Sequence, residues 1–225
     1  MLILSGIGVI ALVGGAAWLK SLPNVDDAEG RVRATLGASG GTDTNEASLG
    51  KVAQAIVAIE DRRFYDHPGI DPISLGRDAL TVITGGQAGG AATITQQLAK
   101  ALYVRTDQSL AAELSIAGVA IKLEQRYTKA QLLEMYLNAI YYGHSYWGIW
   151  QASEGYFGKA PNELDWAEAS LLAGLPRAPT TYDPAVHFDL ARERQIVVLR
   201  ALVEVRALNN AQASAAHSEL TALDR

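Results

Sequence analysis

Glu60-Asp61-Arg62-Arg63-Phe64-Tyr65-Asp66-His67-Pro68-Gly69 is the most informative stretch of this sequence. It follows a run in which Val52, Ile56 and Ile59 recur at helical spacing. The pattern predicts a helix that leaves the core at Glu60, where a carboxylate can project into a cleft. Taken alone, such a charged cluster is more typical of a helix cap or an ion-pair network than of a catalytic site. Three further sequence blocks favour the catalytic interpretation.

The second block begins with a glycine-rich loop, Gly85–Gly90, and continues into Thr93-Ile94-Thr95-Gln96-Gln97-Leu98-Ala99-Lys100. Thr93 and Gln96 have the spacing of a capping box, so a helix is expected to start there. Gln96, Gln97 and Lys100 then lie within about one turn. Backbone N–H groups at a helix start, two amides and a lysine suit a polar or anionic ligand. A flexible linker before an amphipathic helix is the alternative.

The third and fourth blocks are also helical. Thr128 and Gln131 again fit a capping box, and an apolar stripe runs on to Gly143 as the expected stop. The stripe consists of Leu133, Tyr136, Leu137 and Ile140. The fourth block reads Ala167-Glu168-Ala169-Ser170-Leu171-Leu172-Ala173-Gly174-Leu175-Pro176. Helical periods with little β-branched alternation predict a mainly α protein.

Over about residues 49–184, these blocks resemble, in this order, the peptidoglycan glycosyltransferase domain of family 51. The matches are a Glu-Asp-Arg-x-Phe-x-x-His-x-Gly pattern at Glu60–Gly69, a Thr-Ile-Thr-Gln-Gln pattern at Thr93–Gln97, a Tyr-Leu-Asn-x-Ile-Tyr-x-Gly pattern at Tyr136–Gly143, and the Ala167–Pro176 block. The resemblance implies a lysozyme-like α lobe with a smaller membrane-facing lobe.

The resemblance also implies a reaction. Such enzymes polymerise lipid II into β-1,4 glycan strands and release undecaprenyl pyrophosphate, with inversion at the anomeric carbon. Glu60 matches the general base, and Lys100 matches a lysine that binds the pyrophosphate. The residues expected to bind substrate are Asp61, Arg62, Phe64, His67, Thr93, Gln96, Gln97, Lys100 and Arg105. A divalent cation, Mg²⁺ or Mn²⁺, is expected at the leaving group, and no organic cofactor.

Several positions depart from the family pattern. An arginine, an Arg-Lys pair and a second glutamate of the family fall on Gln108, Ala112-Glu113 and Ile116, and a serine falls on Ala92. Loss of cationic stabilisers commonly slows such a reaction by orders of magnitude. Arg105 could supply a second cation, or Glu113 could replace the missing acid. The alternatives are a weakened pseudoenzyme that binds lipid II or a synthase, and a lysozyme-like lytic enzyme.

The N-terminal region predicts a membrane anchor. Residues 2–19 carry no charge, and a helix of that length spans about 27 Å, close to the bilayer core. A cleaved signal peptide is the alternative, although a basic start and a clear cleavage site are missing. We therefore expect an anchor at 1–20, a linker without a packed core at 21–48 and a glycosyltransferase domain at 49–225. The domain would face outward from the bacterial inner membrane in a single-pass arrangement.

Two other segments carry predictions. Between Ile70 and Ile83 the apolar residues Ile73, Leu75, Leu80, Val82 and Ile83 form either a lipid-contacting patch or ordinary core. Residues 190–223 read as helical, with one face packed on the domain through Ile196, Leu199, Leu202 and Val203. The chain length leaves no room for a transpeptidase domain, so the chain is expected to be monofunctional or a fragment.

Composition limits the partners. A net charge of −5 and a pI near 5.4 argue against nucleic acid. The sequence has no cysteine, which excludes disulfides and zinc thiolate sites. The expected partners are lipid II, the growing glycan strand, the membrane, and a transpeptidase or other cell-wall synthesis proteins.

Overall fold

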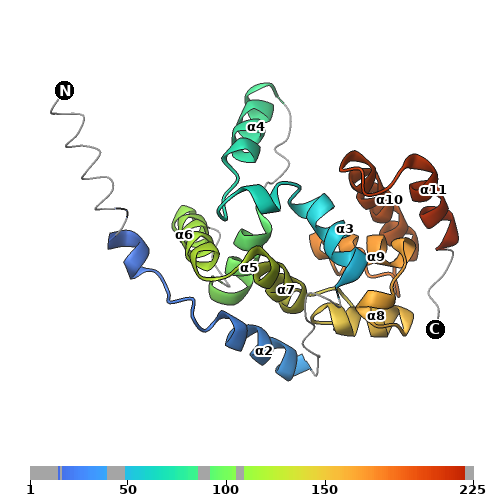
Figure 1. Cartoon of the computed structure of the whole chain (residues 1–225), viewed down its shortest axis with the longest axis horizontal. Helices are drawn as coiled ribbons and strands as arrows, with labels where there is room; N and C mark the ends of the chain where they lie inside the picture. Colours follow the sequence, from blue (N-terminus) through green and yellow to red (C-terminus); the bar gives the residue numbers. More distant parts are fainter. Residues whose placement is uncertain (1–14, 16, 40–48, 86–91, 105–108, 221–225) are drawn as a thin grey trace.

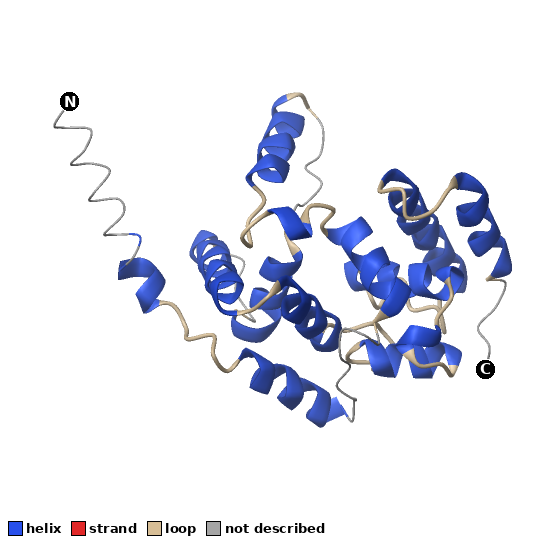
Figure 2. Cartoon of the chain, viewed as in Figure 1, coloured by secondary structure: helices blue, strands red, loops and turns tan. Residues whose placement is uncertain are grey.

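The computed structural model describes residues 15, 17–39, 49–85, 92–104 and 109–220. Within these ranges the chain consists of helices joined by loops (Figure 2). The described residues contain no strand, only an isolated antiparallel bridge between Tyr141 and Trp147. The mainly α prediction is confirmed. The division into a lysozyme-like lobe and a smaller lobe stays a prediction.

The helices follow one another with short connections. Residues 17–21 are helical. The α-helices that follow are α2 (Ala28–Ser39), α3 (Gly50–Glu60), α4 (Pro72–Ile83), α5 (Ile94–Tyr103), α6 (Leu110–Arg126), α7 (Lys129–Ala139), α8 (Ile149–Phe157), α9 (Trp166–Gly174), α10 (Phe188–Glu204) and α11 (Asn210–Glu219). Three short 3₁₀ turns lie between them, η2 (Phe64–Asp66), η3 (Pro161–Glu163) and η4 (Leu175–Arg177).

The helices pack as two groups that share one hydrophobic core. α2, α5, α6 and α7 form one group, and α3, α9, α10 and α11 form the other. α8 contacts both α7 and α9 and so connects them. α4 stands away from both groups at the top of Figure 1. The C-terminal end of α3 and the N-terminal end of α5 therefore come from different groups, and the candidate site lies where they meet.

The segment predicted as a linker is partly a packed helix, so that prediction is wrong for residues 25–39. Val25, Ala28, Val32 and Leu36 are buried in the common core. The spacing of Ala28, Val32 and Leu36 puts them on one face of α2, although glycine, arginine and threonine dilute the pattern in the sequence. The hydroxyl of Tyr127, which is also buried, donates to the Val25 carbonyl at 3.0 Å. The folded part of the chain thus begins well before residue 49.

The two predicted capping boxes are confirmed. Thr93 caps α5 together with Gln96, and Thr128 caps α7 together with Gln131. The predicted end of α7 at Gly143 is wrong, because the helix ends at Ala139. Ile140 is extended there, and Tyr141 turns away to pair with Trp147. The apolar stripe continued past the helix end because Ile140 still packs against the core.

The C-terminal prediction is confirmed in outline. α10 and α11 are helical, with Leu199 and Leu202 buried and Ile196 and Val203 half-buried. The predicted anchor, residues 2–19, lies mostly outside the described residues. Among the described residues, no helix combines the length and the apolar character that crossing a bilayer requires.

Candidate active site

Glu60 is the last residue of α3, as predicted, and its side chain is only 12% exposed. The amide nitrogen of Gln97 donates to Glu60 Oε2 at 2.8 Å. The guanidinium of Arg194 on α10 lies 3.8 Å from Glu60 Oε1. One carboxylate oxygen therefore faces an amide from α5 and the other faces a cation from α10.

Tyr136 on α7 fixes the orientation of Gln97. The tyrosine is fully buried, and its hydroxyl donates to Gln97 Oε1 at 3.0 Å. Burial, and secondarily the Glu60 carboxylate, raise the pKa of Tyr136 well above its usual value, so the hydroxyl keeps its proton. Because the Glu60 carboxylate can only accept, the amide nitrogen of Gln97 faces it, and the amide oxygen accepts from the Tyr136 hydroxyl.

A groove of about 780 Å³ lies beside this pair. Its polar lining includes Gln96, Gln97, Lys100 and Glu113, which brings together four of the predicted residues. Ile116 lines the same groove, one turn along α6 from Glu113. The other lining residues are Thr35, Leu75, Ala92, Ala101, Tyr136, Ala139, Ile140, Tyr141, Trp147, Pro176 and Pro179. Thr35 shows that α2, the supposed linker, forms part of the wall.

Glu60 itself lines a second hollow of about 420 Å³. Ala92 belongs to the lining of both hollows, so the two adjoin at the start of α5. Three arginines, Arg62, Arg63 and Arg77, line the second hollow together with Asp61 and Asp71. Glu60 thus lines the hollow with the arginines, while its hydrogen-bond partner Gln97 lines the groove with the lysine.

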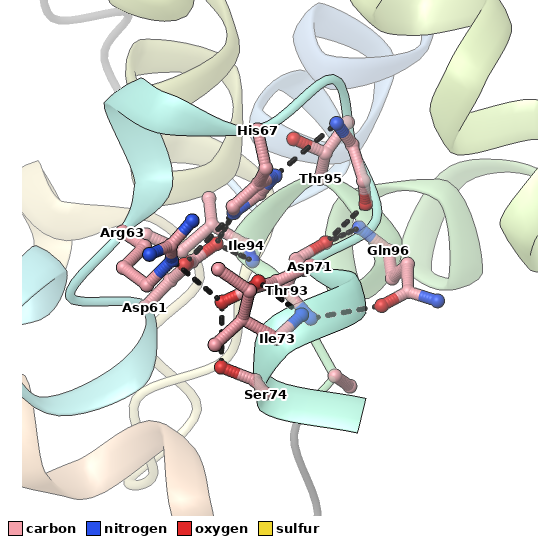
Figure 3. Close-up of polar contacts among 12 residues, drawn as sticks. Asp61, Arg63, His67, Asp71, Ile73, Ser74, Thr93, Ile94, Thr95 and Gln96 are labelled. Atoms are coloured by element: carbon pink, nitrogen blue, oxygen red, sulfur yellow. Dashed lines mark hydrogen bonds and ion pairs between the residues drawn. The ribbon is translucent and has the colours of Figure 1, made fainter. Parts of the chain in front are cut away.

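Asp61 and His67 fasten the motif loop to α5 (Figure 3). Both side chains are buried. Asp61 Oδ2 accepts the N–H of Ile94 at 3.1 Å, and His67 Nε2 lies 3.0 Å from the same carboxylate. His67 Nδ1 accepts the N–H of Gly69 at 3.2 Å, so Nε2 carries the proton given to Asp61.

Thr93, Phe64 and Arg62 also hold the loop in place. The Thr93 hydroxyl donates to the Gly69 carbonyl at 2.6 Å. Phe64 is fully buried, with Lys129 Nζ 4.4 Å from its ring centroid. Arg62 forms an ion pair with Glu204 at the end of α10. Of the residues predicted to bind substrate, Asp61, Phe64, His67 and Thr93 are buried in these contacts, whereas Gln96, Gln97 and Lys100 line the groove.

Arg105 and Gln108 lie outside the described residues. Sequence reasoning missed two residues at the site. Tyr136 was assigned to an apolar stripe, although its motif and its hydroxyl were available signals. Arg194 lies in a helix with alternating charges, and nothing local marks it as a neighbour of Glu60.

No group of three or more His, Asp or Glu side chains within the described ranges could hold a metal ion. Glu113 is the one carboxylate among the described residues that line the groove. Mg²⁺ is commonly bound by one or two carboxylates together with substrate phosphates and water. Glu113 could therefore supply one protein ligand to such a cation.

The fold and the site define a mainly helical protein in which the Glu60 carboxylate lines a hollow that adjoins a larger groove. The transglycosylase family profile matches residues 43–203. The chain therefore belongs to the transglycosylase family, as the sequence motifs predict.

Two relatives illustrate the similarity. Penicillin-binding protein 1F of Bacillus subtilis is 43% identical over 66% of this chain and 21% of its own length. Penicillin-binding protein 1A of Neisseria flavescens is 36% identical over 90% of this chain and 27% of its own length. The chain thus spans a small part of each relative. A crystal structure of penicillin-binding protein 1A from Haemophilus influenzae aligns at 30% identity and a TM-score of 0.42, over 59% of this chain and 16% of that one.

Proposed function

We propose that this protein is a peptidoglycan glycosyltransferase that polymerises lipid II into β-1,4 glycan strands and releases undecaprenyl pyrophosphate. One observation carries the proposal. The Glu60 carboxylate lines one hollow and is oriented by Gln97, which lines the adjoining groove, so a proton acceptor lies where two binding sites adjoin.

In this proposal the hydroxyl of the acceptor sugar enters from the arginine-lined hollow, and Glu60 takes its proton as the hydroxyl oxygen attacks the anomeric carbon. The growing chain occupies the larger groove with its pyrophosphate toward Lys100. The bond to the pyrophosphate breaks as the new glycosidic bond forms, so the configuration inverts. One base suffices for a direct displacement, unlike the paired carboxylates of glycoside hydrolysis.

A divalent cation, Mg²⁺ or Mn²⁺, would neutralise the leaving pyrophosphate. Glu113 would hold it from the first turn of α6, in the same groove as Lys100. This assignment gives Glu113 the role of the acid that the family carries at the position of Ile116. Lys100 would bind the pyrophosphate oxygens directly as a compact point charge.

The same proposal places the protein at the bacterial inner membrane, with the catalytic domain outside and an anchor at 1–20. The substrate carries a lipid, and the relatives named above are penicillin-binding proteins. A transpeptidase that cross-links the product is the expected partner.

The decisive experiment is a lipid II polymerisation assay on the full-length protein, with and without Mg²⁺ or Mn²⁺. Glu60→Gln should lower turnover by roughly 10²- to 10⁴-fold, the usual contribution of a general base. Glu219→Gln, an exposed carboxylate at the end of α11, is the matched control. Near-normal turnover in folded Glu60→Gln protein would falsify the assignment of the base.

A non-catalytic binding protein is the second candidate. Lys100 is the one cation among the described residues that line the groove. A single positive charge would bind the negatively charged pyrophosphate only weakly. This candidate predicts lipid II binding without polymer at any metal concentration. A lytic enzyme would instead shorten purified glycan strands, which the same preparation can test.

A further inference from the structure

Arg194 reaches the candidate base from a different part of the chain. It lies in α10, in the helix group that also contains α3. Its side chain is 15% exposed and that of Glu60 is 12% exposed, so the pair is well shielded from water. A shielded charge pair attracts more strongly than an exposed one, because solvent and salt screen it less.

The guanidinium is held in this place by a second contact. Arg194 Nε donates to the carbonyl of Gly174, at the C-terminal end of α9, at 3.3 Å. A helix C-terminus carries partial negative charge, which also favours a cation there. Nη2 of the same guanidinium is the atom that faces Glu60.

Gly174 makes room for this arrangement. A Cβ at position 174 would lie 2.9 Å from Arg194 Cγ. The φ of Gly174 is −79°, so its backbone is ordinary and glycine is not required for conformational reasons. The absence of a side chain instead lets the Arg194 stem cross the end of α9.

Arg194 does not line either hollow next to Glu60. Its contact with the site described above is the one with the Glu60 carboxylate. Gln97 on α5 holds Glu60 Oε2 by a hydrogen bond, and Arg194 on α10 attracts Oε1. The two partners together restrict the rotation of the carboxylate.

We infer that Arg194 is a positioning residue for the Glu60 base, seated by Gly174, and that it acts on turnover and not on substrate binding. The inference rests on the proposed function, because turnover of lipid II is its readout. Misplacing a catalytic group costs up to about 10²-fold in rate.

Three variants test the inference. Arg194→Met keeps most of the stem and removes the charge, and it should lower kcat roughly 10- to 100-fold with KM within about twofold. Arg194→Lys keeps the charge and should recover a substantial part of the lost kcat. Arg200→Met, on the exposed side of α10, removes an arginine from the same helix and should leave kcat unchanged.

A double-mutant cycle separates positioning from a merely structural effect. In the Glu60→Gln background, Arg194→Met should have little further effect on residual turnover, since the group that it positions is gone. Lipid II binding, measured in the same background, should be unchanged. Melting temperatures show whether each variant is folded.

The outcomes are distinct. An inactive wild-type protein would contradict the proposed function. Active wild type, inactive Glu60→Gln and normal Arg194→Met would overturn only the inference on Arg194. Equal losses in folded Arg194→Met and Arg194→Lys would also overturn it, as would a rise in KM without a fall in kcat.

Discussion

Gln97 connects α3 to α7 through one side chain. Its nitrogen donates to Glu60 and its oxygen accepts from Tyr136. An amide can do both at once, whereas a carboxylate has no donor and a lysine has no acceptor. A glutamate at position 97 would also place a second negative charge beside Glu60. The identity of this residue is therefore set by the two groups on either side of it.

Ser145 offers a test at the same scale. Its φ of +65° lies in the left-handed region, where a side chain is strained and glycine is not. Ser145→Gly should therefore raise the free energy of unfolding, by up to about 1 kcal/mol. Denaturant unfolding measures the change. Ser214→Gly, in the middle of α11, should have the opposite sign, a loss of about 0.5–1 kcal/mol. A lower stability of Ser145→Gly would contradict the strain argument.

Ile116 provides a second test. It lines the groove and is half-buried, so a glutamate there would face the leaving group. Ile116→Glu combined with Gln108→Arg should raise lipid II turnover if the groove lacks charge at these positions. Turnover and melting temperature are measured together. A large loss of stability would show that position 116 is too buried for a charge, and unchanged stability without a gain would favour the non-catalytic candidate.

The sequence predicted Glu60, Gln97 and Lys100 because each lies inside an ordered local motif beside a recognisable helix end. It did not predict Arg194, because the approach of α10 to α3 is a tertiary contact with no local pattern. Asp61 and His67 were predicted to lie at the site, but the sequence did not show what they contact. Their residue types suit catalysis, but burial and backbone partners give them a structural role that only the fold reveals.

At the scale of elements, α2 is the main difference between expectation and structure. Val32 and Leu36 alternate with glycine, arginine and threonine, and that dilution hid the apolar face. α7 shows a related effect, since an apolar period continued past Ala139 although the backbone had left the helix. A periodic pattern of apolar residues indicates which side chains are buried. Such a pattern can continue past the end of a helix wherever the following loop also packs on the core.

Truncation tests whether α2 belongs to the domain. A protein that begins at residue 40 loses the buried side chains of Val25, Val32 and Leu36. Each is worth about 1.5–3 kcal/mol when fully buried, so the total approaches the stability of a whole domain, about 5–15 kcal/mol. Thermal melting should show little cooperative folding, whereas a protein that begins at Leu22 should melt normally. Equal melting temperatures would mean that α2 is dispensable.

α11 docks on α10 through a histidine that is sensitive to pH. His217 lies next to Gln195, at 2.9 Å, and Arg192. Burial, and secondarily the Arg192 charge, lower the pKa of His217 from its ordinary value of 6.5. The unfolded chain then binds this proton more readily than the folded protein does. The stabilisation is complete above about pH 6.5 and decreases as the pH falls below that value.

The corresponding measurement is the free energy of unfolding between pH 7.5 and 5, expressed as a slope against pH. His217→Gln should reduce the loss of stability on acidification. His187→Gln replaces an exposed histidine before α10 and serves as the control. An unchanged slope in His217→Gln would exclude this histidine as the origin of the pH dependence.

At the scale of the whole molecule, the groove is a consequence of how the two helix groups meet. α3 and α10 supply Glu60 and Arg194 from one group, while α5, α6 and α7 supply Gln97, Lys100 and Glu113 from the other with Tyr136 behind them. α4 stands beside this junction (Figure 1) and contributes Leu75 to the groove wall. A lipid that follows the substrate into the groove would therefore pass α4.

α4 also carries apolar side chains that face solvent. Leu80 is 61% exposed and Ile83 is 80% exposed, and Ile73 and Leu75 are about half exposed. The alternative that these four residues are core is therefore wrong. Exposed apolar side chains gathered on one helix are typical of a surface that contacts lipid or a partner, and the substrate proposed for the groove favours lipid.

Vesicle binding tests this last point on a protein that begins at Leu22, so that the predicted anchor cannot contribute. The truncated protein should sediment weakly with phospholipid vesicles. Leu80→Asp with Ile83→Asp should reduce the partition coefficient roughly tenfold or more, because burying one such side chain contributes about 1.5–3 kcal/mol. Val186→Asp with Val205→Asp, at two exposed valines outside α4, adds the same negative charge and serves as the control. Equal losses in both variants would indicate that charge, and not insertion of α4, governs binding, and no binding by the parent would restrict membrane contact to the N-terminal segment.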